Sequence, residues 1–297
     1  MQISRVAEIT GHSAGIYSLD HDGTFIYSAS ADKYVTRWNP LTAKQDGLTI
    51  KFDFPVYAIR YFPNYNQLVA GLNNGDIHIF DLTSRKEIKF FRQHKSGIFY
   101  ILSNATKDQW YASDADGNLS VWSISSHSLL AYFPFDCGKI RRMALNKDGS
   151  RLALAAQDGT IRLLDTIHFN ELSCFHAHKN GSTAVVFDAL HENQLWTGGK
   201  DGMLRVWDID TNELFKELPA HNFVIYDLIS SSSGEFIFSV SRDKTIKIWD
   251  VSSQSFVHRL DSKSAGHRHS VNALCLLNED LFASAGDDKR VLVWKSF

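Results

Sequence analysis

Hydrophobic and polar residues alternate along short stretches of the chain, and turn-forming residues separate these stretches. Within residues 225–250, for example, IYDLIS is followed by SSSGE, FIFSVS, RDK and TIKIWD. Alternation with a period of two, in stretches rich in Val, Ile, Phe and Tyr, is typical of β-strands that bury one face. No long stretch follows the helical period. The pattern therefore predicts an all-β fold built from short strands.

The same pattern recurs at a nearly constant interval. Strand-ending aromatic or apolar residues follow one another at intervals of 42, 42, 42, 43, 42 and 45 residues, which defines seven repeats. These markers are Trp38, Phe80, Trp122, Leu164, Trp207, Trp249 and Trp294. Each repeat contains four short predicted strands, and most copies carry Asp-Gly or Asp-Lys in the turn before the marker, where a positive φ is required. Such regularity predicts a single repeat-built domain over residues 1–297.

Two dipeptides recur at fixed places in the repeats. Gly-His stands early, at residues 11–12 and 266–267, and Trp-Asp stands late, at residues 207–208 and 249–250. In these motifs and in its repeat length the chain resembles the WD-repeat β-propeller family, and the resemblance extends over essentially all 297 residues. It implies a seven-bladed β-propeller with four antiparallel strands per blade. It implies much less about function, because this fold serves many unrelated functions.

The two ends of the chain are expected to close the ring together. The sequence stops at VLVWKSF, one strand short of a complete seventh repeat, while its first residues match the pattern of the fourth strands elsewhere. We expect residues 1–9 to supply the outer strand of the last blade. That strand would pair an edge that could otherwise associate with another chain.

Composition and charge exclude several classes of protein. Lys and Arg (31) nearly balance Asp and Glu (33), so that nucleic acid, which usually needs a basic excess, is not the expected partner. The cysteines, Cys137, Cys174 and Cys275, have no CxxC spacing and indicate free thiols in a reducing compartment. Neither a signal peptide nor an apolar run of about 18 residues is present. We expect a soluble, cytoplasmic protein without membrane contact.

Four repeats carry a His, a hydroxyl residue, an Asp and a Trp at matching positions, with the hydroxyl ten residues and the Asp six residues before the Trp. The sets are His12, Ser28, Asp32 and Trp38; His178, Thr197, Asp201 and Trp207; His221, Ser239, Asp243 and Trp249; and His267, Ser284, Asp288 and Trp294. Taken singly, each set resembles a catalytic triad. Four equivalent copies without a GxSxG elbow favour a structural role instead. In the WD-repeat family the matching residues form a hydrogen-bond chain from Asp through His and hydroxyl to the indole N–H, which needs an acceptor when it is buried.

These considerations predict no catalytic residue, no cofactor and no metal site. The thirteen histidines include His267 and His269, only two residues apart, but no third metal ligand is evident nearby. An enzyme using the central channel would need paired carboxylates or a metal cluster there, and the residues aligned at the channel mouth supply none.

Three repeats depart from the pattern. Repeat three keeps His94, Asp116 and Trp122 but has Ala112 at the hydroxyl position, and repeat four keeps only Asp158. Repeat two keeps no member of the set. We therefore expect blades five, six, seven and one to be more firmly linked than blades two to four.

The resemblance to propellers also indicates where a partner would bind. In propellers, the loops from fourth to first strand and from second to third strand gather around one mouth of the channel. The residue after the one that opens each first strand should point toward that mouth. These residues are Tyr17, Tyr57, Phe99, Arg141, Thr183, Tyr226 and Asn272. Aromatic and arginine side chains suit an interaction hot spot, although aromatic residues in first strands also pack between blades.

A second ring precedes the turn Asp of each repeat and includes Lys200, Arg242 and Asp287. Together with Lys139 and Arg141, these positions predict a basic sector over blades four to six, which could bind an acidic or phosphorylated peptide. Ordinary solvated charge accounts for the sector nearly as well.

The sequence thus predicts a non-enzymatic interaction scaffold, monomeric by itself, that binds a partner peptide or loop at Tyr17, Tyr57, Phe99 and Tyr226, with Arg141 pairing to a carboxylate or phosphate. Two alternatives stay open. A nucleic-acid reader would use Arg141, Arg142, Lys200 and Arg242 and would bind with a steep salt dependence. A structural subunit would instead expose broad apolar patches on the rim.

Overall fold

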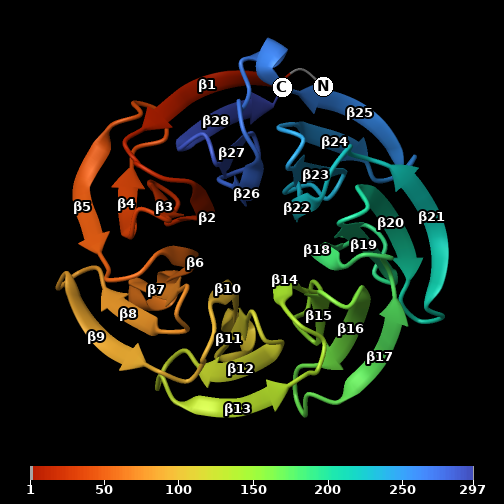
Figure 1. Cartoon of the computed structure of the whole chain (residues 1–297), viewed down its shortest axis with the longest axis horizontal. Coiled ribbons are helices and arrows are strands. Elements are labelled where there is room, and N and C mark those ends of the chain that lie inside the picture. The colour runs from red at the N-terminus through yellow and green to blue at the C-terminus, as the bar shows by residue number, and fades with distance from the viewer. Residues whose placement is uncertain (1–2, 297) are drawn as a thin grey trace.

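The computed structural model describes residues 3–296, which form seven four-stranded antiparallel sheets arranged as blades around a common axis (Figure 1). In blades one to six, the four strands follow sequence order from the axis to the rim. The prediction of an all-β, seven-bladed propeller with four antiparallel strands per blade is confirmed. The described residues contain three short 3₁₀ turns, η1 (Pro63–Tyr65), η2 (Ala105–Lys107) and η3 (Ser262–Ser264). None of their helices is long and apolar enough to cross a membrane.

The strands of the first four blades have the following bounds. Blade one contains β2 (Ile16–His21), β3 (Ile26–Ser30), β4 (Tyr34–Trp38) and β5 (Gln45–Lys51). Blade two contains β6 (Val56–Phe62), β7 (Gln67–Leu72), β8 (Ile77–Asp81) and β9 (Lys86–Phe91). Blade three contains β10 (Ile98–Asn104), β11 (Gln109–Asp114), β12 (Asn118–Ser123) and β13 (Leu129–Pro134). Blade four contains β14 (Ile140–Leu145), β15 (Arg151–Ala156), β16 (Thr160–Asp165) and β17 (Glu171–His176).

The remaining three blades follow the same plan. Blade five contains β18 (Ser182–Phe187), β19 (Gln194–Gly199), β20 (Met203–Asp208) and β21 (Glu213–Pro219). Blade six contains β22 (Ile225–Ser230), β23 (Phe236–Ser241), β24 (Ile246–Asp250) and β25 (Ser255–Leu260). Blade seven contains β26 (Val271–Leu276), β27 (Leu281–Gly286), β28 (Arg290–Ser296) and β1 (Ile3–Thr10).

The first strand of the chain closes the ring. β1 pairs antiparallel with β28, from Ile3 opposite Ser296 to Thr10 opposite Arg290. The expectation that residues 1–9 supply the outer strand of the last blade is confirmed for residues 3–9, while Met1 and Gln2 lie outside the described residues. The blade seven sheet is therefore assembled from both ends of the chain.

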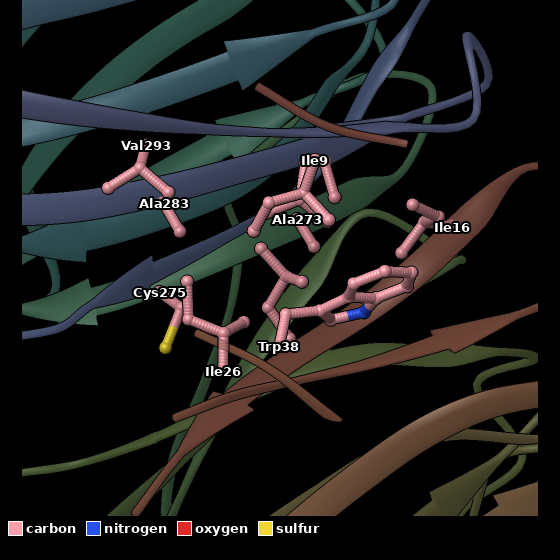
Figure 2. Packing of buried hydrophobic residues seen from close by; sticks show 11 residues of the cluster. Ile9, Ile16, Ile26, Trp38, Ala273, Cys275, Ala283 and Val293 are labelled. Atoms are coloured by element: carbon pink, nitrogen blue, oxygen red, sulfur yellow. The ribbon is translucent and has the colours of Figure 1, made fainter. Parts of the chain in front are cut away.

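Burial follows the position of each strand in its blade. The second strands, such as β3 and β7, are buried along their whole length, because both of their faces pack against neighbouring blades. The outer strands, such as β9, are almost entirely exposed. The buried hydrophobic residues form clusters between adjacent blades. At the junction of blades seven and one, Ile9 and Val293 pack with Ile16 and Trp38 (Figure 2).

The turns between second and third strands share one backbone feature. Their third residue lies in the left-handed region, as in Lys33 with a φ of 75° and Gly117 with a φ of 88°. The same holds at the equivalent positions Gly75, Gly159, Gly202, Lys244 and Lys289. This is the conformation expected from the Asp-Gly and Asp-Lys pairs.

Candidate interaction site at the channel mouth

In four repeats the His, hydroxyl, Asp and Trp side chains form one hydrogen-bonded chain. In blade one, His12 Nδ1 lies 2.7 Å from Asp32 Oδ2, and His12 Nε2 lies 2.7 Å from Ser28 Oγ. The Trp38 indole N–H donates to the same oxygen of Ser28 over 2.8 Å. Equivalent chains join His178, Thr197, Asp201 and Trp207 in blade five, His221, Ser239, Asp243 and Trp249 in blade six, and His267, Ser284, Asp288 and Trp294 in blade seven. Each chain links the loop that enters a blade to that blade's middle strands.

Blade three contains a fifth chain that the spacing rule missed. His94 Nδ1 lies 2.7 Å from Asp114 Oδ2, and His94 Nε2 lies 2.7 Å from Ser120 Oγ. The Trp122 indole donates to the same Ser120 oxygen over 2.7 Å. All four groups of the chain are therefore satisfied in this blade.

The prediction that repeat three lacks a hydroxyl and uses Asp116 was wrong. Ser120 on β12 stands directly opposite Ala112 on β11 in the ladder, so that its side chain reaches the same place from the neighbouring strand. The carboxylate comes from Asp114, two residues before the turn Asp. The sequence indicated that blades two, three and four lack such a chain. Since blade three has one, only blades two and four lack it among the described residues.

Blades two and four fill the same place with apolar groups. In blade two, Phe52 occupies the position of the His and Phe80 that of the Trp, and their ring centroids lie 5.6 Å apart in an edge-to-face contact. In blade four, Cys137, Leu154 and Leu164 pack in one buried cluster. Replacing every member of a buried polar network with apolar groups leaves no unpaired donor or acceptor.

The environment of these chains suits a structural role. The hydroxyl-bearing residues Ser28, Ser120 and Thr197 are 0% exposed, and the same is true of Ser239 and Ser284. No substrate can reach a hydroxyl that is closed off in this way. Burial alone would raise the pKa of Asp243, but the hydrogen bond and charge of His221, together with hydrogen bonds from Thr245 and the backbone N–H of Asn222, outweigh burial and hold that pKa well below the usual range. The Asp243 carboxylate therefore stays ionised and keeps His221 oriented.

Every innermost strand carries a β-bulge directly after its opening residue. The ladder skips one residue in each of β2, β6, β10, β14, β18, β22 and β26. The skipped residues are Tyr17, Tyr57, Phe99, Arg141, Thr183, Tyr226 and Asn272, the same seven positions that the sequence indicates for the mouth. A bulge leaves its extra residue outside the ladder and redirects its side chain, so that one backbone device sets all seven positions.

Three of the bulged residues form a continuous row, which we call the aromatic arc: Tyr17, Tyr57 and Phe99. The rings of Tyr17 and Tyr57 lie 5.1 Å apart and those of Tyr57 and Phe99 lie 5.4 Å apart. The ammonium of Lys139 continues the row, 4.0 Å from the centre of the Phe99 ring. All three aromatic side chains are half-buried, so each combines packing between blades with an accessible face.

Two of the bulged residues link blades instead of facing the mouth. The Thr183 hydroxyl donates to the carbonyl of Ile225 over 2.6 Å, and Thr183 is buried. The Asn272 amide donates to the carbonyl of Ile16 over 3.1 Å and is buried as well. Both side chains therefore spend their hydrogen-bond donors within the protein.

Beside the aromatic arc lies a cavity of about 360 Å³ between blades four, five and six, which we call the cationic pocket. Its lining residues are Lys139, Arg141, Gln157, Ser182, Thr183, Lys200, Phe223, Val224, Tyr226 and Arg242. The Arg141 guanidinium stacks 4.3 Å from the centre of the Tyr226 ring, and that of Arg242 lies 5.9 Å from the centre of the Phe223 ring. The structure thus brings Lys139, Arg141, Lys200, Tyr226 and Arg242, all indicated by the sequence, into one cavity.

The cationic pocket holds positive charge with no carboxylate among its lining residues. Burial and, to a smaller extent, the charge of the neighbouring Arg142 lower the pKa of Arg141 to about 10. Burial also lowers the pKa of Lys139, with additional contributions from Arg141 and Lys200. Like charges in a partly desolvated site raise the free energy of the free protein, and a bound anion would lower it.

Arg142, which the nucleic-acid alternative requires on the surface, is buried in the central channel. Its Nε donates to Asp227 over 2.8 Å, and its second terminal nitrogen donates to the carbonyl of Asn272 over 3.1 Å. It thereby bridges blade four to blades six and seven. Burial alone would lower the pKa of Arg142, but Asp227 raises it above the ordinary value. Arg142 is therefore not available to nucleic acid, as that alternative would need, because the bulge at Arg141 leaves the next residue pointing into the channel.

The channel contains carboxylates that the mouth positions do not reveal. Asp20 accepts a hydrogen bond from the backbone N–H of Tyr61 over 2.6 Å and lies 3.7 Å from the Arg60 guanidinium. Asp227 accepts one from the backbone N–H of Leu274. Both carboxylates face a cavity of about 230 Å³. Each carboxylate is paired with an arginine and accepts a hydrogen bond from a backbone N–H. Residues 3–296 contain no group of three or more His, Cys, Asp and Glu side chains that could hold a metal ion.

The family comparison agrees with this geometry. The family model described as "WD domain, G-beta repeat" matches residues 3–39, 169–208, 212–250 and 256–295, just over half of the chain. The chain belongs to the WD-repeat family. The matched segments contain the four repeats with regular His, hydroxyl, Asp and Trp spacing. Residues 40–168 escape the match, yet they form blades of the same kind.

Several curated proteins are similar to this WD-repeat propeller. It is 23% identical to the kinesin-like protein KIF21A of Homo sapiens over 100% of this chain and 19% of that protein. It is 26% identical to WD repeat-containing protein 55 of Rattus norvegicus over 75% of this chain and 59% of that protein. It is 24% identical to a guanine nucleotide-binding protein subunit beta of Oryza sativa over 96% of this chain and 82% of that protein. The chain thus spans less than two thirds of the first two relatives. WD-repeat propellers typically mediate contacts between proteins and are generally not enzymes.

Sequence reasoning missed two groups of residues around this site. Phe223 is 56% exposed and forms a wall of the cationic pocket; an apolar residue in the polar loop before β22 was the available signal. The channel pairs, such as Arg142 with Asp227, gave no signal, because their members lie 85 residues apart in the chain.

Proposed function

We propose that this chain is a non-enzymatic interaction platform that docks a peptide or loop of a partner protein across the channel mouth. The observation that carries the proposal is the seven-fold bulge, which sets one side chain of every blade apart from its ladder. At Tyr17, Tyr57 and Phe99 these side chains form a continuous aromatic row with accessible faces. Large aromatic side chains beside arginines have the composition of interaction hot spots.

Two neighbouring surfaces, the aromatic arc and the cationic pocket, would both bind the partner. The aromatic arc would receive apolar or aromatic side chains of the partner. The cationic pocket, with Arg141, Lys200, Tyr226 and Arg242, would receive an acidic or phosphorylated group. The likeness to a protein named as the beta subunit of a guanine nucleotide-binding protein supports a role inside an assembly.

The experiment is a quantitative affinity purification from the source cells with three proteins of equal melting temperature. These are the wild type, the mouth variant Tyr57→Ala/Phe99→Ala and the rim variant Leu214→Ala/Phe215→Ala, which changes exposed residues on β21. We expect at least one partner to fall about tenfold or more with the mouth variant, the effect of losing about 1.4 kcal/mol of binding free energy, and to be retained by the rim variant. Retention of every partner by the mouth variant would contradict the proposal.

The rim offers a second candidate surface. Phe215 is 63% exposed, Leu172 is 53% exposed and Phe256 is 51% exposed, each on the outer strand of a different blade. These side chains support the alternative of a subunit held by its rim within an assembly. Loss of partners with the rim variant alone would favour this alternative over docking at the mouth.

We infer further that the protein works in the cytoplasm and is monomeric by itself. Its three cysteines are free, which suits a reducing compartment, and the ring closes on its own strands. Light scattering of the purified chain should give the mass of one copy.

A further inference from the structure

We propose that the cationic pocket is a phosphate-binding subsite, which takes a phosphoserine or phosphothreonine of the docked partner segment. This inference rests on the proposed function and specifies the chemistry of one half of the mouth. The partner segment would place its phosphorylated residue between blades four, five and six and an apolar neighbour on the aromatic arc.

Cationic side chains from three blades converge on the pocket. Lys139 and Arg141 enter the pocket from blade four, Lys200 from blade five and Arg242 from blade six. Within residues 3–296, none of these four side chains makes an ion pair or donates a side-chain hydrogen bond, and Lys139, Arg141 and Arg242 contact aromatic rings instead. Donors that come from three blades and have no protein acceptor are free to bind one external anion.

The Arg141 side chain has a donor that no group of residues 3–296 satisfies. Its Nε is buried and has no hydrogen-bond partner, while its guanidinium stacks on the ring of Tyr226. A buried, unpaired donor on a charged group is costly, and an oxygen acceptor placed in the pocket would satisfy it. The contact with the Tyr226 ring holds the guanidinium carbon 4.3 Å from the ring centre and restricts the side chain, and a guanidinium can form paired hydrogen bonds to two oxygens of one ligand.

The two kinds of acidic ligand differ in their charge and in their number of acceptor oxygens. A carboxylate brings one negative charge and two oxygens, whereas a phosphomonoester brings a charge of about −1.5 to −2 and three strongly accepting oxygens. Four cations around one cavity match the phosphomonoester better. The pocket also differs from a nucleic-acid surface, since it is a single cavity bounded by Phe223 and Tyr226 and the chain as a whole has a net charge of −2.

The test uses the full chain and degenerate peptide libraries with a central phosphothreonine, threonine or glutamate. We expect the phosphothreonine library to be retained at least about tenfold more than the other two. The variant Lys200→Ala/Arg242→Ala removes two exposed cations of the pocket and should abolish that preference. The matched variant Lys51→Ala/Lys89→Ala removes two exposed cations from the outer strands β5 and β9 and should keep it.

Three results would overturn the inference: equal retention of the three libraries, a preference for glutamate, or loss of the preference in both double variants. A parallel arm with vesicles that contain phosphoinositides checks the other source of phosphomonoesters, and binding to vesicles without binding to phosphopeptides would overturn it too. If these tests fail while the variant Tyr57→Ala/Phe99→Ala still loses its partner, docking at the mouth stands and only its phosphate chemistry is wrong.

Discussion

At the scale of single residues, the hydrogen-bonded chains show that the hydroxyl between His and Trp can come from either of two neighbouring strands. Ser28 stands on the second strand of blade one, whereas Ser120 stands on the third strand of blade three, and both accept from a tryptophan and contact a histidine. A fixed spacing from the tryptophan finds only the first arrangement. The sequence therefore predicts the type of chain but not every member. Residues opposite each other on neighbouring strands reach the same place, although they lie at different distances from the tryptophan in the sequence.

The chain in blade three should matter for stability. We expect Ser120→Ala to lower the free energy of unfolding by about 1 to 3 kcal/mol, because it leaves the buried His94 Nε2 and Trp122 indole N–H without a partner. The exposed Ser126→Ala, a loss of the same atoms in the turn of the same blade, should change it by less than about 0.5 kcal/mol. Urea unfolding of both variants measures this, and equal midpoints would show that the chain contributes nothing.

The histidines of blades five and six should make the protein sensitive to mild acid. Burial lowers the pKa of His178 and His221 below their ordinary value. The unfolded chain then binds more protons than the native one near and below about pH 6.5, so stability is complete above that pH and is lost as the pH falls. We expect the melting temperature to fall from about pH 7.5 to about pH 5.5, and to fall less in His221→Gln. A melting temperature that rises as the pH is lowered over this range would contradict the predicted loss of stability in acid.

At the scale of the element, the loop that enters each blade is held by two different chemistries. Most blades use the histidine, while blade two uses Phe52, which is buried and contacts both Phe80 and His78 edge-on. The sequence shows that the polar set is missing from this repeat. It does not show that a phenylalanine replaces the histidine, because only the packed loop places Phe52 against the third strand.

The same loop provides a matched pair of variants. Phe52→Ala should lower the free energy of unfolding by about 3 to 5 kcal/mol, since it opens a cavity between blades one and two. Phe54→Ala, two residues away in the same loop and 44% exposed, should lower it by less than about 1 kcal/mol. Thermal or urea unfolding compares them. Similar losses in both variants would mean that the buried ring does not hold the loop.

At the scale of the whole molecule, the ring is stabilised by contacts between distant segments. Arg142 and Asp227 join blades four and six across the channel, and Asp20 joins blade one to the backbone of blade two. The repeat period predicts seven blades, because blades one to six each form from one continuous stretch of sequence, and the match of the first residues to the fourth strands predicts how blade seven is completed. Which residues meet across the channel depends on the curvature of the closed ring, and no local pattern encodes it.

Ring closure by β1 makes the last prediction. Deleting residues 1–9 removes most of the pairing with β28 and the Ile9 side chain, which is 1% exposed between blades seven and one (Figure 2). We expect the melting temperature to fall by about 10 °C or more, because a loss of several kcal/mol shifts a chain of this size by about 2 to 4 °C per kcal/mol. The uncovered edge of β28 should also promote self-association, visible by light scattering. A synthetic peptide of residues 1–12 added to the truncated chain should restore both properties, since the strand contributes through pairing and burial and not through its covalent link. A truncated chain that melts like the full one, or that the peptide does not rescue, would mean that the other three strands of blade seven close the ring without β1.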